Sequence, residues 1–204
     1  MNRGTYITVI VFLVFAIGIY GQSTRVRELS EAISSGDVTL SANGNGSSSG
    51  AAIIGTLTNS TSAEIRVNVT ITGGIYLRNS GSGQNMVGTQ IFLFSGGYTE
   101  SGTSRFIKLP SSSITGILII AFCSDFELDN PSRGDNFSIA PMPTRLQSIS
   151  EKISRYLHDN FDDDPVIPVQ LALWNFQGES RSHIREKFNF DDSDWMLAAD
   201  IIDY

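Results

Sequence analysis

The sequence predicts an α+β domain, in which an antiparallel β-sandwich or partly open barrel is followed by a C-terminal helical cap. Residues 51–124 contain segments in which apolar and polar side chains alternate, as in strands with one buried face. Turns rich in glycine and serine separate these segments, whereas residues 144–204 carry apolar side chains at helical spacing. Because 204 residues suit one core, we expect the helices to cover the strands within a single domain, residues 51–204.

The N-terminus has the pattern of an export signal. Arg3 precedes an apolar run at residues 7–20, which is shorter than the roughly 20 residues of a membrane-spanning helix. We therefore predict that residues 1–21 are a signal peptide or an N-terminal membrane anchor. The protein is expected outside the cell or on its surface, and to contact a membrane only through this segment.

The segment at residues 22–50 is predicted to be a flexible arm or linker. Residues 24–35 allow a short amphipathic helix, because Val26, Leu29 and Ile33 fall on one helical face. The run of Asn, Gly and Ser at residues 43–50 is typical of a flexible connection.

The strand region is expected to hold five or six strands. The clearest is the segment from Ile65 to Ile71, in which every second residue is apolar. Further strands are predicted at residues 75–77, 86–94, 105–109 and 114–124, each next to a turn signal.

The C-terminal third is expected to hold four helices. The first starts after Pro143 and places Leu146, Ile149, Ile153 and Leu157 on one face. The second has Pro168 in its first turn, where a missing N–H costs nothing. The others are predicted at residues 180–187 and at residues 195–202, the last capped by Asp191 or Ser193.

Composition excludes some classes of partner. The formal net charge of −7 and the lack of a basic stripe argue against nucleic-acid binding. The acidic residues Asp162, Asp163 and Asp164 lack the spacing of a calcium loop, and no metal or cofactor motif is visible. We therefore expect no metal and no cofactor.

Four Asn-X-Ser/Thr triplets are compatible with glycosylation of an exported protein. They begin at Asn45, Asn59, Asn68 and Asn136.

The only cysteine of the chain, Cys123, ends its most apolar internal run, residues 117–123. One cysteine cannot form a disulfide within its own chain, so in an oxidising compartment it is free, intermolecular, or used for other chemistry. A small buried thiol with no function is the simplest alternative. Another unusual residue is Gln170, which the apolar residues Val169 and Leu171 flank in a predicted helix.

These two residues lie in patches that resemble the motifs of bacterial surface thioester domains. Phe122-Cys123-Ser124-Asp125-Phe126 resembles the aromatic-Cys motif, and Val169-Gln170-Leu171-Ala172-Leu173-Trp174 resembles the apolar-Gln-x-Ala-apolar-Trp motif. The resemblance implies an internal thioester between Cys123 and Gln170, in a compact variant. It also implies covalent attachment to an amine-bearing ligand such as a surface protein. Phe122, Phe126, Leu173 and Trp174 would line a water-poor pocket around the bond.

The adhesive domain would be no turnover enzyme and would have no catalytic residues. Two other functions remain open at the level of the sequence. The first is a filament or coat subunit of the cell surface. Such a subunit would self-associate through its strand edges, and its Cys123 would be inert. A secreted thiol hydrolase would instead need His158 or His183 beside Cys123.

Overall fold

A closed, six-stranded antiparallel barrel forms the centre of the computed structural model, which describes residues 25–161 and 163–204. The strands follow one another around the barrel in the order β10-β2-β3-β9-β6-β5. Their bounds are β2 Val38–Gly44, β3 Ser49–Asn59, β5 Thr70–Asn79, β6 Met86–Leu93, β9 Ser113–Cys123 and β10 Asn136–Ala140. The predicted α+β class is confirmed, and the barrel is closed rather than partly open.

Strand β9 lies between β3 and β6 and supplies much of the barrel core. Ile119 pairs with Ile53 on one side and with Ile91 on the other, and all three side chains are fully buried. The β-branched residues along β9 favour this extended, doubly paired position. Strand β10 pairs with both β2 and β5 and so closes the barrel.

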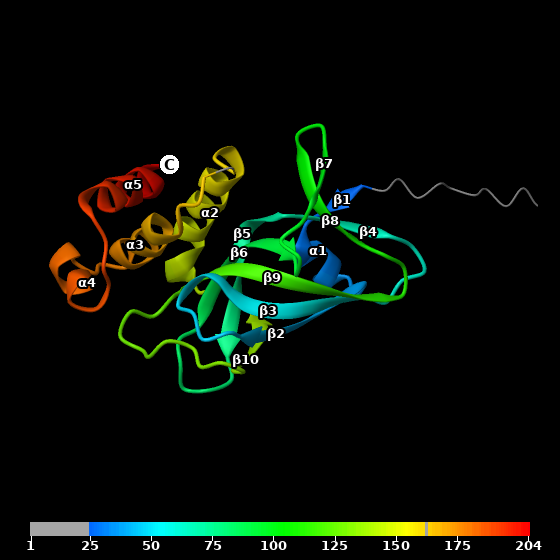
Figure 1. Ribbon diagram of the computed structural model, residues 1–204, viewed down its shortest axis with the longest axis horizontal. Coiled ribbons are helices and arrows are strands. Elements are labelled where there is room, and N and C mark those ends of the chain that lie inside the picture. Colours follow the sequence, from blue (N-terminus) through cyan, green and yellow to red (C-terminus); the bar gives the residue numbers. More distant parts are fainter. Residues whose placement is uncertain (1–24, 162) are drawn as a thin grey trace, which may run out of the picture.

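A second sheet has four strands in the order β1-β4-β8-β7, with bounds β1 Val26–Arg27, β4 Ile65–Asn68, β7 Thr99–Ser101 and β8 Ser104–Leu109. Figure 1 shows this sheet and helix α1 (Leu29–Ser34) at one end of the molecule. The sandwich expectation is therefore only partly confirmed, because a second sheet exists but the larger one closes on itself.

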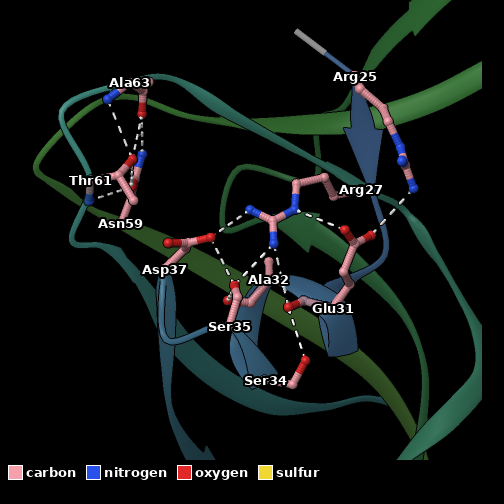
Figure 2. A network of polar contacts seen from close by, with 10 residues as sticks. All are labelled: Arg25, Arg27, Glu31, Ala32, Ser34, Ser35, Asp37, Asn59, Thr61 and Ala63. Carbon is pink, nitrogen blue, oxygen red and sulfur yellow. Dashed lines mark hydrogen bonds and ion pairs between the residues drawn. The ribbon is translucent and has the colours of Figure 1, made fainter. Parts of the chain in front are cut away.

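The predicted flexible arm is wrong for its described part, because residues 25–50 form β1, α1, β2 and the start of β3. Leu29 and Ala32 of α1 are fully buried in the core, which offsets the cost of ordering this segment. Arg27 of β1 also binds the carboxylate of Asp37 at 2.8 Å (Figure 2).

Four helices make up the C-terminal part, with bounds α2 Thr144–Asp159, α3 Val166–Phe176, α4 Arg181–Lys187 and α5 Asp192–Asp203. They gather at the end of the barrel opposite the second sheet (Figure 1). The Ser150 and Ser154 hydroxyls bind the main chain of Gly73 and hold α2 on β5. The predicted cap of the last helix is confirmed, since Asp191 and Asp194 form a capping box.

The predicted signal peptide or anchor at residues 1–21 lies outside the described residues. Within residues 25–161 and 163–204, no helix has the length and apolar composition that crossing a membrane requires.

Candidate functional site

Cys123 is the last residue of β9 and lies opposite Met86 of β6. Its side chain is fully buried, as the apolar run before it predicts. Its backbone N–H donates to the carbonyl of Ser48, in the loop between β2 and β3, at 3.1 Å. The thiol is therefore placed at the end of a barrel strand that pairs with β3 and β6.

Gln170 lies on α3, a helix whose residues Pro168 to Trp174 are all buried. Both polar atoms of its side chain bind the main chain of Cys123. The Cys123 N–H donates to Gln170 Oε1 at 2.9 Å, and Gln170 Nε2 donates to the Cys123 carbonyl at 2.8 Å. The structure thus brings together the two residues that the sequence motifs single out.

A second glutamine, the C-cap residue of α3, binds the residue that follows Cys123. Gln177 Nε2 donates to the carbonyl of Ser124 at 3.1 Å and to that of Leu173 at 3.0 Å. Gln177 follows Gln170 by seven residues, which places both on one helix face. Sequence reasoning missed this residue, although its spacing from Gln170 is a usable signal once α3 is assigned.

An ionic network lies just after the thiol. Arg145 of α2 pairs with Asp125 at 2.6 Å, and Asp125 also accepts hydrogen bonds from Asn85 and the Ser124 hydroxyl. Burial, with a smaller contribution from the Asp125 charge, raises the pKa of the Cys123 thiol to about 12. At neutral pH the free thiol is therefore protonated.

The four predicted lining residues are all buried, but they do not form one wall. Phe126 and Trp174 pack edge to face, with ring centroids 5.0 Å apart. Phe122 instead lines a separate cavity of about 180 Å³, together with Val166 and Val169 at the start of α3. Leu173 is fully buried in the core beside Trp174.

Helix α4 covers the outer side of Phe126. The His183 ring packs on Phe126 with a centroid separation of 4.9 Å, and the Lys187 ammonium lies 4.9 Å from the centre of the same ring. Lys187 also pairs with Glu127 at 2.8 Å. The last turn of α4 is therefore tied to the loop that follows the thiol.

Neither histidine supports a thiol hydrolase in the described part of the chain. His183 Nδ1 lies 2.8 Å from Glu179 and its Nε2 lies 3.3 Å from Glu127, so both ring nitrogens face carboxylates. His158 lines a cavity of about 490 Å³ with Glu28 and Asn68, and no hydrogen bond joins it to Cys123.

Glu127, Glu179 and His183 lie close enough together to share a metal ion, a grouping that sequence reasoning missed. The spacing of Glu179 and His183, four residues apart, was its only sequence signal. The Lys187 ammonium already neutralises Glu127, so the arrangement is explained as a network of ion pairs.

The four glycosylation triplets differ in exposure. Asn136 is exposed, and Asn45 and Asn68 are half-buried. Asn59 is fully buried, and its amide nitrogen donates to the carbonyls of Ala63, Leu109 and Pro110. Figure 2 shows the part of this network that includes Thr61. A glycan would replace one of the two hydrogens of this buried nitrogen and disrupt these bonds, so the folded chain assigns Asn59 a structural role.

Comparisons of the chain with protein-family models, with curated proteins and with solved structures found no match.

Proposed function

We propose that this chain is an exported surface domain that forms an internal thioester between Cys123 and Gln170 and attaches covalently to an amine-bearing partner. The main observation that supports this proposal is the hydrogen bonding of the buried Gln170 amide to the main chain of Cys123. This pairing joins a primary amide to the main chain of the residue that carries the only thiol of the chain. The bond is used once, so the protein is a reactive binder and not a turnover enzyme.

The chemistry balances without any cofactor. The Cys123 sulfur attacks the side-chain carbonyl carbon of Gln170, the S–C bond forms, and the C–N bond breaks. The thiol proton leaves with the amide nitrogen as ammonia. A primary amine then attacks the same carbon, the S–C bond breaks, and a proton from the amine restores the thiol. The Gln170 side chain ends as an amide of the partner.

The hydrogen bond from the Cys123 N–H to Gln170 Oε1 supports both steps. That oxygen carries the negative charge in the tetrahedral intermediates of bond formation and of aminolysis. A donor already placed at 2.9 Å stabilises this charge without reorganisation.

Burial supports a long-lived bond. Cys123 and Gln170 are both fully buried, which keeps water away from the carbonyl. The burial that raises the pKa of the free thiol also makes its sulfur a poor leaving group.

A second candidate function is a structural subunit of the cell surface with an inert Cys123. The observation that favours it is the second sheet, whose outer strands β1 and β7 offer edges for pairing with other chains. In this function the Gln170 amide simply satisfies the main chain at the end of β9.

The test is the intact mass of the purified protein before and after methylamine treatment. The thioester form is one ammonia lighter than the processed sequence and gains one methylamine on treatment, while one alkylatable thiol appears. The control is Gln170→Met, which keeps the side-chain volume and removes the amide. It is expected to show the full sequence mass and no adduct.

One alternative product also lacks an ammonia. An amide between Lys187 and Gln170 would have the same mass as the thioester, but Cys123 would be alkylated on denaturation without methylamine. That result, or a full sequence mass for the untreated protein, would reject the thioester and leave the structural subunit.

A further inference from the structure

Trp174 lines a cavity of about 240 Å³, which we call the Trp174 pocket. Trp174 follows Gln170 by four residues and therefore lies on the same face of α3. Ser48, whose carbonyl accepts the Cys123 N–H, forms part of the wall. The remaining wall comes from Gln84, from residues 126–130 and from Lys187 and Phe188.

Two buried polar atoms of this wall have no hydrogen-bond partner. They are Trp174 Nε1, a donor, and Gln84 Oε1, an acceptor. Trp174 is 4% exposed and Gln84 is 3% exposed. Gln84 Nε2 donates to the Leu128 carbonyl at 2.8 Å, which fixes the orientation of the amide and the position of its oxygen.

These two atoms stand apart from the other unpartnered buried atoms of the described residues. The others are Nε atoms of Arg27 and Arg181, whose terminal nitrogens bind carboxylates. Leaving a buried donor or acceptor unpaired costs about 1–3 kcal/mol. Because Trp174 and Gln84 both line one cavity, a ligand there with the complementary donor and acceptor would remove this cost.

The complementary group is a carboxamide or a peptide group, whose carbonyl accepts from Trp174 and whose N–H donates to Gln84. Asp129 adds a carboxylate to the rim, which attracts a cationic amine, whereas Glu127 is paired with Lys187. Lys187 is an exposed wall residue, held by its ion pair with Glu127 and by the Phe126 ring.

We propose that the Trp174 pocket binds a peptide or carboxamide group of a cationic, amine-bearing partner and so presents the amine to Gln170. The role in attachment rests on the proposed thioester, whereas the binding itself does not. The pocket would therefore select amines that carry an amide over simple alkylamines.

The test follows the two tryptophan indole signals in ¹H–¹⁵N spectra, since the chain has only Trp174 and Trp195. The protein is the processed Cys123→Ala variant, in which no thioester forms, and the probe is glycinamide. We expect a saturable shift of the Trp174 signal with no saturable shift of the Trp195 signal. Trp195→Phe assigns the two peaks.

Ethylamine, which has an ammonium group but no amide, is the matched probe and is expected to bind about tenfold more weakly. Gln84→Met keeps the side-chain volume and removes the acceptor, so glycinamide affinity is expected to fall by a similar factor. An unchanged Trp195 signal shows that this variant remains folded.

A Trp174 signal that does not shift saturably with glycinamide would overturn the proposal, and so would equal affinity for ethylamine. Either result would indicate that water satisfies the two atoms. Because the variant lacks Cys123, failure here leaves the mass measurement on the wild-type protein unaffected, and failure of the thioester leaves the binding result standing.

Discussion

At the residue scale, the environment of Cys123 decides how a free thiol at this position behaves. Burial raises its pKa from the reference value of 9.0 to about 12. An exposed thiol with the reference value would be half ionised at pH 9, whereas about one in a thousand molecules would be ionised in the folded chain. Since the thiolate is the reactive form, folding protects Cys123 from alkylation.

We predict that Cys123 in the Gln170→Met variant reacts with iodoacetamide at pH 9 at least one hundredfold more slowly than in urea, because few thiols are ionised and the sulfur is buried. The rate should still rise between pH 9 and pH 12 in the folded protein. Intact mass after timed quenching measures both rates. A folded rate that levels off near pH 9 would contradict the raised pKa.

The raised pKa of Cys123 also determines how the stability of the protein with a free thiol changes with pH. The folded state holds its proton up to a higher pH than the unfolded state does. The stabilisation from the neutral thiol is therefore complete below about pH 9 and is lost as the pH rises towards about 12.

The candidate pair could be predicted from sequence, but much of its surroundings could not. An apolar run that ends in a cysteine and a glutamine inside an apolar helix are local patterns. Gln84 carries no such signal, and Gln177 has only its spacing from Gln170, because their partners Leu128 and Ser124 lie 44 and 53 residues away. The buried role of Asn59 was missed for the same reason, since it binds Leu109 across 50 residues.

At the element scale, the contact of α2 with β5 depends on two adjacent glycines. Gly73 and Gly74 both have positive φ angles, of 70° and 68°. A Cβ on Gly74 would meet the Ser150 hydroxyl of α2 and lie 3.2 Å from the Gly88 carbonyl, whereas a Cβ on Gly73 would meet nothing within 4 Å. Substitutions at the two glycines therefore allow the cost of backbone strain to be distinguished from the cost of steric contact.

We predict that Gly74→Ala destabilises the protein by about 1–3 kcal/mol more than Gly73→Ala, because only the former pushes α2 away from the barrel. Both variants share the cost of a positive φ, so the difference between them isolates the steric contact. Urea unfolding midpoints measure it. Equal midpoints would mean that α2 shifts without cost.

The strands and helices themselves follow local periodicity, and most of them were predicted. Their grouping was not, because the second sheet takes β1, β4, β7 and β8 from separate parts of the chain. Three strands of the barrel, β2, β3 and β10, were not predicted. In β10 only Phe137 of the five residues is buried, so its alternation is weak. Without β10 the sequence gives no reason to expect a closed barrel.

At the scale of the whole molecule, the proposed bond would join the barrel to the helices. Cys123 ends β9, and Gln170 lies 47 residues later on α3. A covalent link that closes a loop of this length removes entropy from the unfolded chain and stabilises the folded state by about 4 kcal/mol on the loop-closure model.

We predict that methylamine lowers the unfolding temperature of the wild-type protein by about 10 °C, because it opens this link. The Gln170→Met variant should show no change on the same treatment. Calorimetry before and after treatment measures the shift. A wild-type protein that forms the methylamine adduct without losing thermal stability would show that the link does not constrain the unfolded chain.

The order of Cys123, β10 and α3 along the chain also sets an order of events during synthesis. Residues 136–140 leave the ribosome after Cys123, and α3 leaves later still. While an exported chain is being threaded through a membrane, its thiol therefore travels as an ordinary reduced cysteine with no acyl partner in place. On the proposed function, the thioester would form only after the last third of the chain has been exported. Completion of folding would then produce the reactive bond outside the cell, where the proposed partner is met.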